Sequence, residues 1–434
     1  MPSHFASIES NPPIEVWRLI KLFKEDTNPN KVNLGIGVYQ DDKGKTETLP
    51  VVRYVEQELA ENNATNKMYL EHTGLGSYCD SGLKLVLGED SPCVIEKRAV
   101  SVQSLGGTGS LRIGFEFLYQ NGYTTVYLPT PTWPNHTAIL QAINIEVVEY
   151  RYWNSDKLSI DIDGLLEDLS MAPPKSVILL HACAHNPTGS DPTREQWMKI
   201  GAMIRQKEHI AFFDLAYQGF STGDLDEDAW AIRYFAHDLN LELFVAQSFS
   251  KNFVLYSERV GQLIGVFHKS DVISAFQSQV TTIIWSLYLT PPDHGARVVS
   301  TILNDPILMN EWKFNVKSMS ERIKSTRYQL YTKLRLLNTP GNWEHIITQT
   351  GMFAYTGLTQ AQCRILVERH SCYLTLNGRI NVCAITTKNV DYIAEQIYQV
   401  LIASEPYIKK TSISQHFAGE EFTERRPSPH SLAI

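Results

Sequence analysis

Short apolar runs alternate with helix-like patterns between about residues 98 and 268 of the chain. Strands that alternate with helices form a mostly parallel sheet covered by helices, so this pattern predicts an α/β fold. Each run has the length and the aliphatic or aromatic content of a buried strand. The runs are residues 124–128, 145–150, 176–180, 210–213, 243–247 and 262–266.

Longer helical patterns dominate after Pro291, and a short αβ segment follows them. This change predicts a second, smaller lobe. We expect the N-terminal stretch to complete that lobe, because residues 32–35 precede the large-lobe pattern and the helix-like residues 13–23 need a surface to pack on. The patterns after Pro291 cover residues 293–303, 306–337, 351–355, 361–368 and 389–401.

These changes of pattern predict three regions. A large domain covers residues 48–310, and a small domain combines residues 1–47 with 311–408. Residues 409–434 are polar and contain few apolar side chains, so we expect a flexible C-terminal tail.

Composition narrows the class of protein. The chain has 434 residues, 43% of them hydrophobic, and a net charge of −8 from 47 acidic and 39 basic residues. This balance argues against nucleic-acid binding and permits an anionic small substrate held by local arginines. The six cysteines are scattered without a C-x-x-C pair, which is typical of reduced thiols. With no apolar leader and no apolar run approaching membrane-span length, we expect a cytosolic protein without membrane contact.

Lys251 is the first candidate for chemistry, in the stretch Ser248-Phe249-Ser250-Lys251-Asn252-Phe253. The stretch follows the run 243–247, so it lies where a parallel sheet binds its ligands. A buried lysine near another positive charge has a lowered pKa and can form a Schiff base. Arg259 can supply that charge and can also bind an anion. A solvated loop lysine is the alternative for the tetrapeptide alone.

Two further segments have the features of a ligand site. Glycines in the segment LGGTGSLR, residues 105–112, precede an apolar helix pattern, and free amides at a helix start suit a phosphate. This segment matches neither a P-loop nor a dinucleotide fingerprint. Asp214 ends another buried run, where it needs a cation such as a protonated pyridine nitrogen. His181 and His185 are four residues apart but follow a strand pattern, so we expect no metal site.

Together these segments resemble the aspartate aminotransferase family of fold-type-I pyridoxal phosphate enzymes, in particular a divergent member of its cytosolic branch. The resemblance covers about residues 5–401. It implies a large domain with a mostly parallel seven-stranded sheet between helices and a smaller α/β domain. The motifs that carry it include NLGIGVYQDDKGKTETLPVVR, QSLGGTGSLRIG, PTWPNH, CAHNPTGSDPT, FFDLAYQGF, SFSKNF, ERVGQL, GMFAYTGL and NGRIN.

The resemblance implies pyridoxal 5'-phosphate as the cofactor and Lys251 as the catalytic residue that binds it and moves a proton. It implies that Asp214 pairs with the pyridinium nitrogen and that His136 supports Asp214. Tyr217 and Asn186 are expected at the 3′ oxygen, and Trp133 on the ring face. The expected phosphate ligands are Gly107, Thr108, Ser248, Arg259 and, from the second subunit, Tyr69.

The resemblance also implies substrates and partners, namely an amino acid, a 2-oxo acid and a second copy of the chain that shares the active sites. The reaction expected is that of L-aspartate with 2-oxoglutarate. Arg379 is expected to bind the substrate's α-carboxylate through two parallel hydrogen bonds. The other residues expected to line the substrate site are Gly37, Trp133, Asn186 and Phe353.

One departure from the family concerns specificity. The family binds the distal carboxylate with a second arginine from the partner subunit, six residues before the first proline of its S-N-P-P segment; Trp285 stands there instead. Losing one partner of a close charge pair costs roughly 2–5 kcal/mol. We therefore expect weak turnover of aspartate or, alternatively, an apolar pocket for other side chains. A surface tryptophan, with substrate bound in another way, is a third interpretation.

Further departures lie near the lysine. Val254 replaces a glycine of the family motif, and Leu289-Thr290 replaces Ser-Asn. If that glycine has a positive φ, a β-branched residue would strain the lysine loop. Besides an aspartate-type aminotransferase, the sequence is compatible with a related pyridoxal phosphate enzyme, such as a racemase, or a non-catalytic dimeric homologue.

Overall fold

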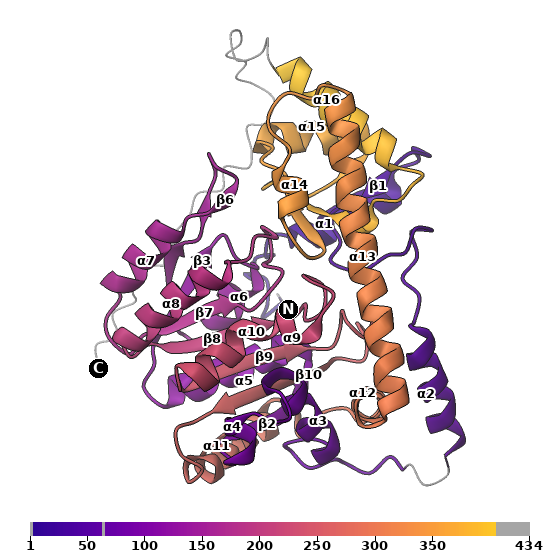
Figure 1. Cartoon of the computed structure of the whole chain (residues 1–434). Coiled ribbons are helices and arrows are strands. Elements are labelled where there is room, and N and C mark those ends of the chain that lie inside the picture. Colours follow the sequence, from indigo (N-terminus) through magenta and orange to yellow (C-terminus); the bar gives the residue numbers. More distant parts are fainter. Residues whose placement is uncertain (1–2, 63–65, 405–434) are drawn as a thin grey trace.

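A seven-stranded sheet forms the centre of the computed structural model, which describes residues 3–62 and 66–404 (Figure 1). The strand order is β2-β10-β9-β8-β7-β3-β4, and β10 is antiparallel to both of its neighbours while the remaining pairs are parallel. The expected mostly parallel α/β architecture is confirmed. Its strands are β2 (Ala99–Leu105), β3 (Thr125–Thr130), β4 (Glu146–Arg151), β7 (Val177–His181), β8 (Ile210–Leu215), β9 (Leu243–Ser248) and β10 (Val260–Val266).

Each of the six predicted runs corresponds to a strand. The predicted and observed ends differ by no more than two residues. The seventh strand, β2, was not singled out by the pattern. Every residue of β7, β9 and β10 is buried. Strands covered on both faces show no polar alternation, which is why apolar runs identified them.

Two layers of helices cover the sheet, as the alternation of apolar side chains along β8 makes clear. Phe212 packs in one hydrophobic cluster, with Phe115 of α5 and Phe276 of α11. The next residue, Phe213, packs in a different hydrophobic cluster. Successive side chains of a strand point to opposite faces, so both faces carry a core. The helices of the large-lobe region are α2 (Pro50–Glu61), α3 (Gly76–Leu87), α4 (Pro92–Ile95), α5 (Gly106–Gln120), α6 (Asn135–Gln141), α7 (Ile162–Met171), α8 (Arg194–Gln206), α9 (Leu225–Asp228), α10 (Trp230–Arg233), the π-helix η1 (Tyr234–Asp238), α11 (Val272–Tyr288) and α12 (His294–Asn304).

A second hydrophobic core holds the smaller lobe, at the top of Figure 1. Strand β1, near the start of the chain, pairs in parallel with β12, so segments far apart in the sequence meet in this lobe. Strand β11 pairs with β13 in antiparallel fashion. The elements are α1 (Glu15–Glu25), β1 (Val32–Asn33), α14 (His345–Thr348), β11 (Phe353–Tyr355), α15 (Gln360–His370), β12 (Cys372–Tyr373), β13 (Arg379–Asn381), the 3₁₀ helix η2 (Val382–Ala384) and α16 (Val390–Ser404).

The long helix α13 (Pro306–Leu336) runs between the two lobes (Figure 1). Its residue Trp312 packs in the core that contains Phe213, and Leu330 packs in the small-lobe core. Arg327, fully buried between them, donates to the carbonyls of Ile346, Thr350, Gly351 and Phe353. One rigid helix thus connects both cores.

The domain boundaries at residues 47/48 and 310/311 stay a prediction. The predicted tail, residues 409–434, lies outside the described residues. The short strands β5 (Trp153–Asn154) and β6 (Ser159–Ile160) form a separate hairpin. No helix within residues 3–62 and 66–404 combines the length and apolar character that a membrane span needs.

Candidate active site

Polar side chains gather where three neighbouring parallel strands end. Asn186 lies in the loop after β7, Asp214 is the penultimate residue of β8, and Lys251 follows the end of β9. The order of these strands in the sheet is β9-β8-β7, so their carboxyl ends lie next to one another. This edge of an open α/β sheet is the expected ligand site.

Lys251 lies within reach of two other predicted site residues. Its Nζ lies 5.2 Å from the centre of the Tyr217 ring. Burial lowers the pKa of the Lys251 ammonium from its ordinary value of 10.5 to about 8; the negative charge of Asp214 opposes this shift and the positive charge of Arg259 adds to it. A substantial fraction of the amine is therefore neutral in mildly alkaline solution, as nucleophilic attack on a carbonyl requires.

A directed chain of hydrogen bonds ends on Asp214. A carboxylate only accepts, so His136 donates from Nε2 to Asp214 Oδ2 at 3.0 Å. Thr132 Oγ1 lies 2.8 Å from Nδ1 of His136 and accepts from Nε2 of His181 at 3.0 Å. Finally, the backbone N–H of Asn186 donates to Nδ1 of His181 at 3.4 Å. Burial lowers the pKa of His181 to about 3, which keeps this ring neutral.

Asp214 is an ionised group in a buried position. Burial alone raises its pKa, but the hydrogen bond and the charge of His136 lower it, and the net pKa lies below the ordinary 3.8. A buried carboxylate that remains charged needs a cationic partner. The edge of the sheet therefore favours a ligand with a protonated ring nitrogen beside Asp214.

The first turn of α5 lies against Ser248 and Arg259. At Gly107 an added Cβ would lie 3.1 Å from Cβ of Ser248. The glycine therefore lets the start of α5, including Thr108, pack close to Ser248. The Arg259 guanidinium donates to Tyr256 O at 3.0 Å and to Ser250 Oγ at 3.3 Å. Helix amides and a fixed guanidinium together suit a phosphate.

Arg379 lies on the small-lobe side of the same site. It donates to Asn186 Oδ1 at 3.2 Å and to Gly35 O at 2.8 Å, and its guanidinium lies 4.3 Å from the Phe353 ring centre. Its Nε is buried and has no hydrogen-bond acceptor among the described residues. An added Cβ at Gly37 would lie 3.4 Å from Phe353. The unpaired Arg379 Nε–H, close to a glycine that has no side chain, suits a small carboxylate.

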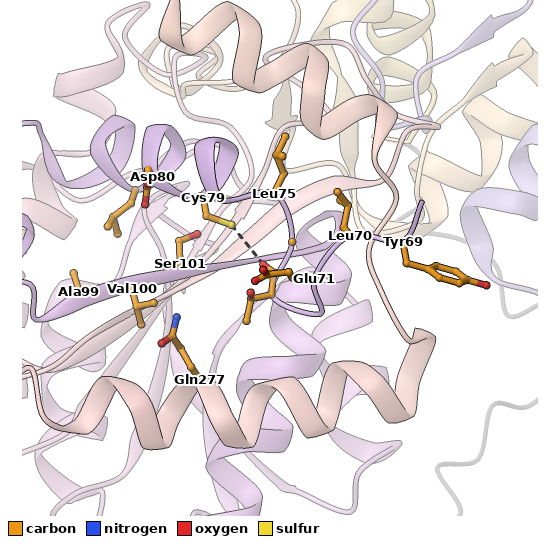
Figure 2. A pocket seen from close by; sticks show the side chains of 14 residues that line it. Tyr69, Leu70, Glu71, Leu75, Cys79, Asp80, Ala99, Val100, Ser101 and Gln277 are labelled. Atoms are coloured by element: carbon orange, nitrogen blue, oxygen red, sulfur yellow. Dashed lines mark hydrogen bonds between the residues drawn. The ribbon is translucent and has the colours of Figure 1, made fainter. Parts of the chain in front are cut away.

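Two aromatic candidates differ in position. Trp133 is half-buried and packs edge-on against His136, with ring centres 5.3 Å apart. Tyr69, by contrast, is 78% exposed. Together with Arg259 it lines a surface cavity of about 510 Å³, and Figure 2 shows its ring turned away from a second cavity of about 490 Å³ beside β2. Within one chain the Tyr69 side chain is thus free to meet another molecule.

Several residues of the site were not predicted from the sequence. Ser250 holds the Arg259 guanidinium, although it lies in the quoted motif SFSKNF. Thr132 and His181 complete the chain to Asp214, and a polar residue next to Trp133 was the only local signal for Thr132. In the part of the chain that the structure describes, no three histidine, cysteine or acidic residues are placed to hold a metal ion.

The departures from the family pattern lie near the end of α11, in the turn after it, and in the lysine loop. Trp285, near the end of α11, is 60% exposed in the single chain. Leu289 follows with φ 68° and ψ −68°, and Thr290 N donates to Tyr288 O across it, which is a strained γ-turn. Val254 has a φ of +56°, the positive value for which the sequence predicted strain.

We expect the reactivity of Lys251 in cofactor-free protein to rise as the pH passes through about 8. The folded pKa lies below that of the unfolded chain, so between about 8 and 10.5 the unfolded state binds more protons and the free energy of unfolding rises with pH. Labelling by an amine-reactive reagent, followed by mass spectrometry, measures the profile. Exposed Lys269 serves as the control, and an identical midpoint for both lysines would contradict the expectation.

Comparisons with known proteins agree with this geometry. Residues 29–397 match the family model described as aminotransferase class I and II. The cytoplasmic aspartate aminotransferase of Gallus gallus is 46% identical over 406 residues, which cover 92% of this chain and 98% of the relative. The solved structure of the Saccharomyces cerevisiae cytoplasmic aspartate aminotransferase matches with a TM-score of 0.90 and 41% identity, over 92% of this chain and 99% of the other.

An aromatic-amino-acid aminotransferase from Burkholderia pseudomallei, covalently bound to pyridoxal phosphate, matches equally well. Its TM-score is 0.89 at 38% identity, covering 92% of this chain and all of that one. The family match and the identity over nearly the whole length lead to one conclusion. This chain belongs to the class I and II aminotransferases and is a transaminase of the aspartate aminotransferase family.

Proposed function

We propose that this chain transfers the amino group of L-aspartate to 2-oxoglutarate, with oxaloacetate and L-glutamate as products, and that its turnover of these dicarboxylic substrates is weak. Aminotransferases of this class use pyridoxal phosphate, which acts as an electron sink when bound. The observation that carries the proposal is the half-buried lysine with a lowered pKa near the ionised Asp214, together with Arg379 bound to Asn186 in the same site. A divergent cytosolic paralogue of the family fits these features.

The residues of the site fit the cofactor. Asp214 is a buried negative charge suited to a pyridinium nitrogen, and the hydrogen bond from His136 keeps it oriented. The anion site formed by Gly107, Thr108, Ser248 and Arg259 suits the phosphate. Asn186 and Tyr217 are assigned to the 3′ oxygen, and Trp133 to the ring face.

Lys251 is the catalytic residue in this proposal. With the cofactor bound, its Nζ would be the attachment point, and as a free amine it would take the proton from the substrate Cα and pass it to C4′ of the cofactor. The lowered pKa suits both roles, since the amine releases and accepts a proton near neutral pH.

Substrate orientation is assigned to Arg379. Its guanidinium binds the α-carboxylate, using the Nε that lacks an acceptor among the described side chains and backbone groups. Asn186 holds the guanidinium from one side and Phe353 packs against it, so the side chain is already ordered before substrate binds. Gly37 leaves room beside Phe353 for the substrate.

Specificity is expected to depend on Trp285. An exposed indole offers no charge to a distal carboxylate, which supports slow turnover of aspartate and glutamate. An exposed tryptophan also provides apolar surface for a larger side chain. These two consequences define the amino acids that a functional assay must compare.

We also propose a homodimer with shared sites in the cytoplasm. Tyr69, exposed next to the cavity that contains Arg259, is the residue expected to reach the partner's phosphate site. The exposed side chains of Phe5, Ile8 and Trp17 near the N-terminus support an interface between copies. The cytoplasmic location is supported by the name of the chicken relative.

A panel of amino acids tests the proposal. Protein loaded with pyridoxal phosphate is mixed with a single amino acid, and the change of the visible absorbance of the bound cofactor is followed. We expect L-aspartate and L-glutamate to react slowly and 2-oxoglutarate to reverse the change. Absence of any visible band that depends on Lys251 would exclude the enzymatic proposal, and formation of D-aspartate without an oxo acid would identify a racemase.

A further inference from the structure

Val254 occupies a backbone conformation that β-branched residues avoid. Its φ is +56°, in the left-handed region where Cβ crowds the backbone and where glycine or asparagine is usual. The Val254 N–H donates to the Lys251 carbonyl at 3.0 Å, closing a turn that begins at Lys251. A return of Val254 to negative φ would break this bond and reorient Lys251.

The side of the loop that faces α13 is held firmly. Asn252 Nδ2 donates to Gln218 O at 3.2 Å, and Trp312 Nε1 donates to Asn252 O at 2.8 Å. The rings of Phe253 and Trp312 stack with centres 4.3 Å apart. Strained residues persist only where the surroundings over-determine them, and these contacts do so for Val254.

The side of the loop that faces the anion site is held by a second strained residue. Arg259 has a φ of +55°, and its guanidinium contacts Ser250 Oγ and Tyr256 O. Ser250 N in turn donates to Ser248 Oγ at 3.2 Å. Lys251 therefore lies between two restrained segments, and the turn bond from Val254 sets the backbone orientation between them.

We propose that Val254 is a positioning residue whose backbone strain opposes the loop conformation that presents Lys251 to the cofactor. This inference rests on the proposed role of Lys251. If the cofactor binds only one loop conformation, its apparent affinity is proportional to the fraction of chains that have this conformation. The valine thus weakens cofactor retention without touching the cofactor.

Two substitutions relieve the strain and keep the loop sequence otherwise intact. Val254→Gly and Val254→Asn both place a residue that tolerates positive φ. We expect both variants to release pyridoxal phosphate more slowly, by about tenfold, which corresponds to about 1.4 kcal/mol. They differ in side-chain volume, so a shared effect identifies the backbone and not the lost valine packing as the cause.

The control is Lys97→Gly. Lys97 also has a positive φ, +53°, but it is exposed and precedes β2, whose other end meets the site. The Lys97→Gly variant relieves backbone strain at a position away from the lysine loop, so it shows the effect of strain relief that does not act on Lys251. The measurements are the rate of cofactor loss after dilution, the pH midpoint of Lys251 labelling in cofactor-free protein, and the thermal unfolding temperature.

Slower cofactor loss and a lowered Lys251 midpoint in both Val254 variants, with neither change in Lys97→Gly, would support the inference. A higher unfolding temperature with an unchanged release rate and midpoint would overturn it, because the strain would then be structural only. Lys251→Ala distinguishes the proposed function: native transaminase activity in this variant would refute the role of Lys251 itself.

Discussion

Replacement of Lys251 by alanine is expected to lower transamination by at least about 10³-fold, because a positioned proton-transfer group alone contributes roughly 10²- to 10⁴-fold. The same change removes the attachment point for the cofactor, so the part of the visible absorbance that depends on this attachment is expected to disappear. Steady-state rates with L-aspartate and 2-oxoglutarate, together with absorbance spectra, measure both effects.

Two observations separate loss of chemistry from loss of fold. Burial lowers the pKa of Lys251, so the folded protein bears a cost for its charged form. Alanine removes that cost, and we expect the cofactor-free variant to unfold at an equal or higher temperature. Lys269→Ala, an exposed lysine in the next segment, is the matched control and should retain full activity. Residual activity above a tenth of the native rate would contradict a catalytic role for Lys251.

Trp285→Arg is expected to raise kcat/KM for L-aspartate by about 30- to several-thousand-fold. The range follows from roughly 2–5 kcal/mol for a close charge pair, with about 1.4 kcal/mol for each factor of ten. Trp285 is exposed near the end of α11, so the longer, flexible arginine can be accommodated without disturbing the core. Rates over a range of aspartate concentrations measure the effect.

Leu287→Arg is the control for a general effect of positive charge. Leu287 lies two residues further along α11, and two helical residues are about 200° apart around the axis, so its side chain faces another direction. We expect this variant to leave aspartate turnover unchanged. If Trp285→Arg raises turnover no more than Leu287→Arg does, position 285 does not set the specificity and the substrate is bound in another way.

Local sequence pattern predicted most of the elements that build the site. The run 243–247 became β9, and Lys251 follows it at the carboxyl edge as expected. Central strands buried on both faces are apolar throughout, so short-range composition was sufficient to find them. The strand β2 was not singled out, although its pairing with β10 completes the sheet.

Side-chain geometry was much less predictable. Nothing local to Ser250 indicated that it would hold Arg259, and the chain from Asn186 through His181 and Thr132 to His136 joins three separate segments. Hydrogen bonds between distant segments depend on how strands stack in the sheet. The strand order is a long-range property that periodicity does not contain.

The sequence by itself determined the α/β class, the location of Lys251 after a buried strand, and, through its ordered motifs, the family. The tertiary structure alone decided that Arg379 meets Asn186 across the two lobes and that Val254 has a positive φ. The physical reason is that propensity and periodicity act over a few residues, whereas these features arise where two hydrophobic cores, joined by α13, fix distant backbone segments against each other.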